Sequence, residues 1–412
     1  MSEAAEDPSE AAEDPPEPGS AGTGPPPGSA GPESAPRYDL RALLLGLVFL
    51  HGAFAAGMIP VLNRQLEDWA PPAFALYYAG MVAGQLAICF FARLTRSRRS
   101  LGLFELLFAG ALLYMGLTLT RWGFVSGRLL EGIGSGLTLP LIFYGVLQLR
   151  AWGSEEKRIA FMNTGFALGF AAGPFLAAVG VALAGTGPLL LMFAAAFGIC
   201  ALGLAVRPPA PALPKPTAEA AAPPGFARFW PLFLAKIGYG YLLTVLAGHA
   251  QTLFPNLAER TAPLTRLVQR LPGLSDADLS VPWILLALGI VFTAGQVIAT
   301  PLLRRLGPAP LLIAGPLVLA AGALGLALTG RGEWVFLMSL GHSVLVLLGY
   351  RLLAVSPDGP RTFAMFNVAT DPGLVIGALF ANLGAQGAWG LCLAGLVALA
   401  LPRPSAPLTE SP

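Results

Sequence analysis

The chain has 412 residues, of which 55% are hydrophobic and 12% are charged, and it carries a net charge of +2. Soluble domains carry about 25% charged residues, so this composition cannot cover a water-facing surface and indicates a membrane protein with most of its length in lipid. The small net charge gives no reason to expect a nucleic-acid partner. The three cysteines are too far apart for a metal or redox motif, and neither a cofactor nor a metal site is expected.

The predicted elements begin after an acidic, proline-rich segment. Residues 1–36 repeat the phrase Glu-Ala-Ala-Glu-Asp-Pro and cannot bury enough apolar surface to order themselves, so a disordered cytoplasmic tail is expected. Beyond it, long apolar runs alternate with short breaks, and about 20 residues suffice to cross the hydrocarbon as a helix. Twelve membrane-spanning helices are predicted, at 38–62, 71–92, 101–120, 123–148, 158–183, 187–206, 229–254, 281–303, 309–329, 334–355, 361–383 and 387–402. The last run is short and close to the eleventh, which leaves eleven spans as the alternative.

The basic residues are distributed unequally between the breaks. If the N-terminus is cytoplasmic, 17 of the 25 Lys and Arg residues fall in cytoplasmic segments, six fall on the opposite side, and Arg128 and Lys236 lie within spans. Because cytoplasmic loops carry the excess of positive charge, both termini are predicted to be cytoplasmic. Arginine outnumbers lysine 22 to 3, which together with abundant Ala, Gly and Pro suggests a GC-rich bacterial genome and a bacterial inner membrane.

A break in composition divides the spans six and six. Residues 207–228 are rich in Pro and Ala and too long for a hairpin turn, so they are predicted to form a cytoplasmic linker. The linker joins an N-terminal bundle (37–206) to a C-terminal bundle (229–403), and a short tail follows at 404–412. Residues 255–280, between spans seven and eight, show an amphipathic pattern and are expected to lie on the outer membrane surface, with a lid over a cavity as the alternative.

The two halves also repeat short sequences in the same order. Residues 83–86 (Ala-Gly-Gln-Leu) in span two match 294–297 (Ala-Gly-Gln-Val) in span eight. Asn163 near the start of span five matches Asn367 in span eleven, and each Asn is followed at the same offset by two glycines four residues apart. Two matches in the expected order predict a parallel duplication.

Twelve spans in two parallel repeats joined by a long polar loop resemble the major facilitator superfamily of secondary transporters, over about 38–402. Residues 128–134 (Arg-Leu-Leu-Glu-Gly-Ile-Gly) are similar to its Arg-x-x-x-Gly-x-Gly motif. Residues 169–178 are similar to the Gly-x-x-x-Gly-Pro-x-x-Gly-Gly motif of its proton-coupled antiporters, with alanines closing the motif. The resemblance implies alternating access of two halves about a central site, and proton-coupled antiport of a drug or metabolite.

Candidate gating or packing residues lie in two of the resembled motifs. The basic loop after span two resembles the superfamily's Gly-x-x-x-Asp-Arg-x-Gly-Arg-Arg loop, but it lacks the acidic residue and has Ser97 in place of glycine. Its charges either only enforce topology or also hold one conformation closed. In span five, glycines four apart allow close backbone approach and a proline bends the helix, for packing or for a hinge. The candidates are Arg93, Arg96, Arg98, Arg99, Gly169, Gly173 and Pro174.

Ionisable side chains within the spans are the candidates for coupling, because a charge in hydrocarbon costs a few kcal/mol or more. Arg128 and Glu131 share a face of span four and can neutralise each other, or Arg128 lines the cavity while Glu131 exchanges protons. Lys236 and Asp371 can form a second pair, either structural or broken and re-formed during transport. Asp371 and Glu131 are the predicted proton-coupling carboxylates, with Arg128 and Lys236 as charge partners. Glu105, four residues into span three, is expected to reach the interface and is assigned no role.

In the resembled fold, spans one, four, seven and ten line the cavity, and all three histidines fall on these spans. Histidine has an unperturbed pKa near neutrality, so the three could hold protons or substrate, while a packed histidine with satisfied hydrogen bonds is the alternative for each. Polar and aromatic residues on the same spans would suit a partly apolar ligand. The substrate-cavity candidates are His51, Tyr144, Gln148, Tyr239, His249 and His342.

The predicted fold class is an all-α membrane protein with twelve transmembrane helices in two pseudo-symmetric six-helix bundles. The predicted function is proton-coupled efflux of a small amphipathic compound by alternating access. Uptake of a sugar or organic anion, by symport or facilitated diffusion, is the alternative within transport, because Arg128, Lys236 and the histidines would attract an anion.

A membrane-embedded enzyme or a non-transporting sensor is the alternative from another class. An enzyme would need a nucleophile–base set or a metal cluster and a sensor a sizeable soluble domain, and the sequence shows neither pattern. No Gly-x-x-x-x-Gly-Lys-Ser loop and no His-Glu-x-x-His motif occurs, so an ion gradient is the expected energy source. The expected partners are a small-molecule substrate, protons and the lipid bilayer, and the expected state is a monomer.

Overall fold

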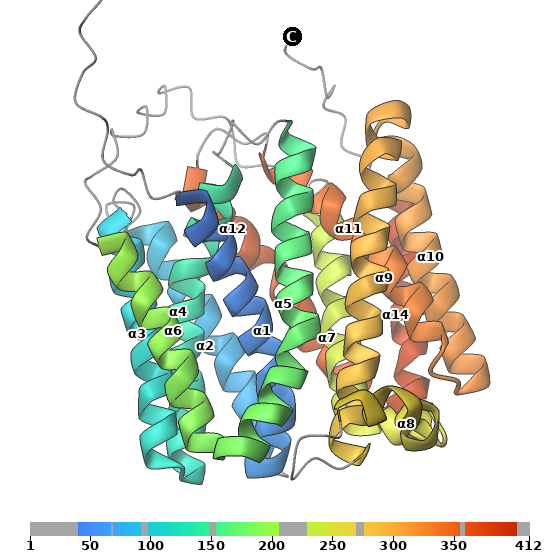
Figure 1. Ribbon diagram of the computed structural model, residues 1–412. Coiled ribbons are helices and arrows are strands. Elements are labelled where there is room, and N and C mark those ends of the chain that lie inside the picture. The colour runs from blue at the N-terminus through green and yellow to red at the C-terminus, as the bar shows by residue number, and fades with distance from the viewer. Residues whose placement is uncertain are drawn as a thin grey trace, which may run out of the picture. The chain divides into compact units, whose positions relative to one another are not determined.

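The computed structural model describes residues 40–66, 69–91, 98–147, 154–205, 229–268, 276–354 and 359–401. These residues are almost entirely helical and contain no strand, which confirms the all-α class for the described part of the chain (Figure 1). The predicted tails and the predicted linker lie outside the described residues. So do three of the predicted site residues, Arg93, Arg96 and Gln148.

The first half contains one helix for each of its six predicted spans. The helices are α1 (Leu40–Leu66), α2 (Ala70–Phe90), α3 (Arg98–Thr118), α4 (Arg121–Leu147), α5 (Glu155–Ala184) and α6 (Thr186–Ala205).

The second half follows the same order with two additional features. A short helix stands between predicted spans seven and eight, and the predicted eleventh span is divided at Asp371 instead of running unbroken. The elements are α7 (Trp230–Leu253), α8 (Leu257–Val268), α9 (Asp276–Leu306), α10 (Pro308–Thr329), α11 (Trp334–Ala354), α12 (Gly359–Thr370), α13 (Pro372–Ala381), the 3₁₀ turn η5 (Gly384–Gly387) and α14 (Ala388–Ala400).

Nine helical segments among the described residues are long and apolar enough to cross a membrane, with α12 and α13 taken as one segment. Three shorter apolar helices, Leu76–Phe90, Trp230–Leu246 and Gly384–Ala400, coincide with predicted spans two, seven and twelve. Each predicted span therefore corresponds to an apolar helix, while the count of twelve membrane crossings stays a prediction.

Proline and glycine set several of the helix ends. Pro231 and Pro308 lie in the first turn of α7 and α10. A backbone N–H has no intrahelical partner at these positions, so proline costs no hydrogen bond there. Gly330 ends α10 with φ 65°, a left-handed conformation that glycine adopts without strain, and its N–H donates to Leu326 O at 2.8 Å. Pro372 cannot continue α12, because its ring clashes with the preceding turn, so a new helix begins at that residue.

The two halves pack their helices in the same pairs. In the first half α1 packs against α5, α2 against α4 and α3 against α6. In the second half the helices at the corresponding places pack likewise, α7 against α13, α9 against α11 and α10 against α14. The repeated pairing supports the parallel duplication predicted from the two short sequence matches.

Glycines hold two of these pairs in backbone contact. A Cβ on Gly169 or Gly173 of α5 would lie much closer to α1 than unbonded atoms can approach, 2.0 Å from Phe49 O and 1.9 Å from Ala53 O. The matching glycines of α13 meet α7 in the same way, and a Cβ on Gly377 would lie 2.1 Å from Ile237 O. Glycines four apart therefore serve tight packing here, and a hinge at Pro174, buried in α5, stays a prediction.

The short helix α8 accounts for part of the amphipathic region predicted at 255–280. Its Thr265 is buried and accepts a hydrogen bond from Trp283 Nε1 of α9 at 3.3 Å. On its exposed side, Arg260 donates to Glu333 in the turn before α11 at 3.1 Å. A backbone hydrogen bond and this bond from Arg260 lower the pKa of Glu333. Contact of α8 with the membrane surface stays a prediction.

We expect Gly173→Ala to lower the thermal unfolding midpoint of the detergent-solubilised protein. The added Cβ would lie 1.9 Å from Ala53 O, so α1 and α5 would have to separate. Overpacking of this kind costs about 1–3 kcal/mol.

The matched control is Gly165→Ala on the same helix, where the new Cβ meets only side chains, Val48 at 3.5 Å and Leu45 at 3.9 Å. Equal unfolding midpoints for the two variants would contradict the close contact.

Candidate functional site

A cavity of about 220 Å³ lies between helices of both halves. Its described lining comes from α1, α2, α4 and α5 of the first half and from α7, α9, α11, α12 and α13 of the second. Helices α3, α6, α10 and α14 contribute no residue to this lining. Most lining side chains are aliphatic or aromatic, and the few polar ones gather around two buried ion pairs.

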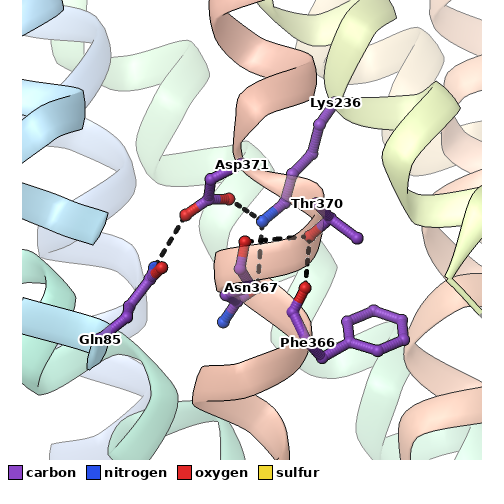
Figure 2. Close-up of polar contacts among 6 residues, drawn as sticks. All are labelled: Gln85, Lys236, Phe366, Asn367, Thr370 and Asp371. Atoms are coloured by element: carbon purple, nitrogen blue, oxygen red, sulfur yellow. Dashed lines mark hydrogen bonds and ion pairs between the residues drawn. The ribbon is translucent and has the colours of Figure 1, made fainter. Parts of the chain in front are cut away.

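The first ion pair joins Lys236 of α7 to Asp371, between α12 and α13 (Figure 2). Lys236 Nζ also donates to Asn367 Oδ1 at 3.0 Å, and the second carboxylate oxygen of Asp371 accepts from Gln85 Nε2 of α2 at 2.8 Å. Asp371 is only 1% exposed, whereas the Lys236 side chain is 15% exposed. The structure thus brings the two predicted partners together and adds a contact to the opposite half.

The break before Pro372 explains why Asp371 is available for this pair. Asp371 stands at the N-cap of α13, but its side chain makes no capping hydrogen bond, and its backbone N–H still donates to Asn367 O at 2.7 Å. Both carboxylate oxygens are therefore free to bind Lys236 and Gln85. The sequence Asp-Pro places an ionised group at a helix joint inside the membrane-spanning region.

The second ion pair lies within α4. Arg128 donates to both carboxylate oxygens of Glu131, at 2.6 Å for Oε1, as their spacing of three residues predicts. The guanidinium also lies over the ring of Tyr77, 4.2 Å from its centroid, in a cation–π contact. Arg128 lines the cavity, while Glu131 is buried and is not among the described lining residues.

Only some of the predicted cavity residues line the cavity. His342 lines the cavity, with its ring centroid 5.6 Å from that of Tyr239, which also lines it. His249 and Tyr144 are half-buried and are not among the described lining residues, so neither is placed in the cavity.

His51 also lies outside the cavity, which corrects its assignment. Its Nε2 is 3.0 Å from Glu105 Oε1 of α3, and the two residues are 4% and 0% exposed. The expectation that Glu105 reaches the interface is wrong as well. Glu105 lies two turns inside α3, on the face that packs toward His51, and it is fully buried.

The cavity contains polar residues that were not predicted as site residues, yet the sequence carried a signal for them. Gln85, Asn163 and Asn367 all line the cavity and all belong to the two sequence matches between the halves. Asn163 Nδ2 donates to Gln296 Oε1 across the halves at 3.2 Å. In the corresponding contact Gln85 donates to Asp371, which lies one helical turn after Asn367. The repeated polar residues therefore meet each other where the halves touch.

Residues of the basic loop are only partly described. Arg99 is exposed at the start of α3, and Arg98 is the first residue of that helix. A cytoplasmic gating role for these arginines stays a prediction. One further contact between the halves is present nearer the helix ends, where Arg304 of α9 donates to Ser154 before α5.

Comparison with known proteins gives a family-level match. The family model described as Major Facilitator Superfamily matches residues 73–391. No match is found among curated proteins.

Several solved structures resemble the chain at low sequence identity. The human organic anion transporter TETRAN is 19% identical with a TM-score of 0.56, and the alignment covers 88% of this chain and 97% of that one. The proton:xylose symporter XylE is 15% identical with a TM-score of 0.61, covering 88% and 93%. The E. coli fucose:proton symporter FucP is 14% identical with a TM-score of 0.58, covering 88% and 97%. At such identity the likeness concerns the fold alone.

We expect Lys236→Met and Asp371→Asn each to destabilise the protein, and the double variant to regain part of the loss. Removing one partner leaves the other charge buried without a counter-charge, which lowers the free energy of unfolding by about 3–5 kcal/mol. The measurement is a double-mutant cycle of thermal unfolding midpoints.

The matched control is the exposed pair of Arg260 and Glu333, whose side chains are 58% and 55% exposed. Its removal should change the stability by less than about 1 kcal/mol. Additive losses at Lys236 and Asp371 would show that the two charges do not depend on each other.

Proposed function

The chain belongs to the major facilitator superfamily of secondary transporters, and from this premise we propose that its cavity carries a small amphipathic acid across the membrane together with a proton. The observation that carries the proposal is the Lys236–Asp371 pair, whose lysine is the more exposed partner beside a largely apolar cavity. Alternating access of the two halves moves the bound compound. A bacterial inner membrane, cytoplasmic termini and a monomeric state remain parts of this proposal.

The cavity wall favours a compound with an aromatic or aliphatic body. Phe74, Phe143, Phe170 and Phe292 line it together with several leucines. Tyr239 joins this surface, and its ring lies 5.7 Å from that of Phe170 across the halves. Aromatic walls of this kind bind apolar surface without fixing one shape, so they suit an amphipathic compound better than a sugar, whose hydroxyls need many hydrogen-bonding groups.

The charges at the cavity favour an acid as the polar end of the substrate. Lys236 and Arg128 are both neutralised by carboxylates in the described state. A proton bound to Asp371 would leave the Lys236 ammonium without its counter-charge, and an anion from the cavity would restore neutrality. A cation bound to Asp371 would instead strand the ammonium beside a second positive charge, which a buried site disfavours.

The same pair offers a route from proton binding to conformational change. Asp371 accepts a hydrogen bond from Gln85 of the opposite half, so its charge state affects a contact between the halves. A protonated carboxyl accepts more weakly than a carboxylate, because charge-assisted hydrogen bonds are the stronger ones. Protonation of Asp371 therefore both frees Lys236 and loosens the contact with α2.

The second candidate function is proton-coupled efflux of a weakly basic amphipathic compound. It is favoured by Asp371, the single carboxylate among the described cavity-lining residues. In that mechanism the cation binds Asp371 and the Lys236 ammonium gives up a proton, so compound and proton move in opposite directions. The direction of proton movement distinguishes the two functions.

The test uses purified protein in liposomes that enclose a pH-sensitive dye. The panel contains arylsulfonates, quaternary arylammonium ions and hexoses, which do not carry protons passively through lipid. Symport predicts that an arylsulfonate added outside acidifies the interior. Efflux by antiport predicts alkalinisation by the quaternary ammonium ion.

We expect Asp371→Asn to abolish the proton movement while retaining exchange of labelled arylsulfonate, since the amide mimics the protonated carboxyl. Lys236→Gln should lose both activities by at least about tenfold, because it removes the counter-charge of the substrate. Glu333→Gln, which changes an exposed carboxylate outside the cavity, is the matched control.

Arylsulfonate movement with no proton signal, or an unchanged proton signal in Asp371→Asn, would contradict proton coupling at this site. Proton-coupled movement of hexoses alone would contradict the proposed substrate class.

A further inference from the structure

A second group of ionisable residues lies inside the first half, away from the cavity. His51 of α1 contacts Glu105 of α3, with Nε2 and Oε1 3.0 Å apart. His51 is also close enough to Glu131 of α4 to interact with it electrostatically, and Glu131 is held by Arg128. The four residues form a buried chain from α3 to the cavity, in which every member is at most 4% exposed. We name this chain the α1–α3–α4 cluster.

Aromatic rings enclose the histidine end of the α1–α3–α4 cluster. The His51 ring centroid lies 4.8 Å from that of Phe108 and 4.9 Å from that of Phe197 of α6. Glu105 Oε2 is buried and has no hydrogen-bond partner in the described part of the chain. Glu105 therefore depends on His51 alone for its stabilisation, in surroundings where an uncompensated charge is costly.

No other described group on the neighbouring helices supplies a compensating charge. The titratable residue of α6 near Glu105 is Cys200, and on α2 the nearest to Arg128 is Tyr77, whose hydroxyl donates to Ser135. Both are neutral when protonated. On α5, the helix that packs against α1 at this level, the neighbour of Gly52 is Phe166, which carries no charge.

The charge of the α1–α3–α4 cluster depends on one proton. With both carboxylates ionised, Arg128 charged and His51 neutral, the four residues carry a net charge of −1. One added proton makes them electroneutral. Since a buried net charge is strongly disfavoured, the neutral state with one proton is the stable one.

We propose that the α1–α3–α4 cluster is a proton-binding site, distinct from Asp371, that holds one exchangeable proton between His51 Nε2 and Glu105 Oε1. The proton comes from water and returns to it, and no covalent bond other than N–H or O–H changes. Loss of the proton leaves the cluster at −1 and strengthens its hold on Arg128, so the charge that Arg128 presents to the cavity follows the protonation of His51. This role in transport rests on the proposed function, whereas proton binding itself does not.

The test observes His51 directly in the full-length protein labelled with ¹⁵N-histidine. The chain has only three histidines. His249→Gln and His342→Gln each remove one imidazole signal and leave the signal of His51 assigned by elimination, with the cluster intact. Imidazole ¹⁵N shifts then distinguish the ring with two protons from the ring with one.

We expect His51 to carry both ring protons near about pH 7, and Glu105→Gln to reduce its protonated fraction at least about tenfold, because the cluster is then neutral without the proton. Glu105→Asp, which keeps the charge, should preserve the two-proton signal. Glu333→Gln on the surface should leave it unchanged.

A His51 ring with a single proton throughout about pH 5 to 8 in the protein with its cluster unsubstituted would overturn the inference, and this measurement needs no cluster variant to fold. Equal protonation in folded Glu105→Gln protein would overturn it too. Neither readout uses substrate or a gradient. If liposomes show no proton coupling while His51 responds to Glu105, only the proposed function fails; if coupling occurs through Asp371 and His51 stays neutral, only this inference fails.

Discussion

A charge inside a membrane is stabilised by a counter-charge beside it, and in the described interior of the chain three contacts bring oppositely charged or chargeable side chains together. Lys236 meets Asp371, Arg128 meets Glu131, and Glu105 meets His51. Because unpaired charges are costly in hydrocarbon, each contact constrains the elements that it links, α7 with the α12–α13 joint and His51 of α1 with Glu105 of α3. Together with the glycine contacts, the buried charges restrict how the helices can pack.

The repeated halves differ at the positions where the charges stand. Gly169 and Gly373 occupy equivalent places, and counting from them gives Ala167 as the counterpart of Asp371. The same two glycines approach Phe49 O of α1 and Phe233 O of α7, and counting from those residues gives Gly52 as the counterpart of Lys236. A Cβ on Gly52 would lie 2.2 Å from Phe166 O, so the first half uses for backbone contact the place that the second uses for an ion pair. The first half carries its charges on other helices instead. The duplicated scaffold is thus symmetric in packing and asymmetric in electrostatics.

Helix positions and charge pairs could be predicted from the sequence, while the neighbours of single side chains could not. The apolar runs located the described helices other than α8, although not the division at Asp371, because length and hydropathy set a membrane span. Arg128 and Glu131 could be paired because their spacing lies within one helix, and Lys236 and Asp371 because a buried charge needs a partner. His51 was misplaced because a helix that lines a cavity also has a face turned away, and only tertiary packing decides which face a residue occupies. Glu105 was misjudged for the same reason, because its contact with His51 of α1 belongs to a packed interior that the sequence of α3 alone does not reveal.

The glycine contacts between α7 and α13 have a mechanical consequence. With the Cβ position of Gly377 2.1 Å from Ile237 O, the two helices touch along their backbones and have no side-chain layer between them that could deform. A pull exerted on Lys236 by a bound compound would therefore reach α13 as well as α7, over the stretch where the two helices touch. The two helices would then move as one stiff unit, with the pull applied in the second turn of α7. A small tilt there would become a larger displacement at the far end of α7.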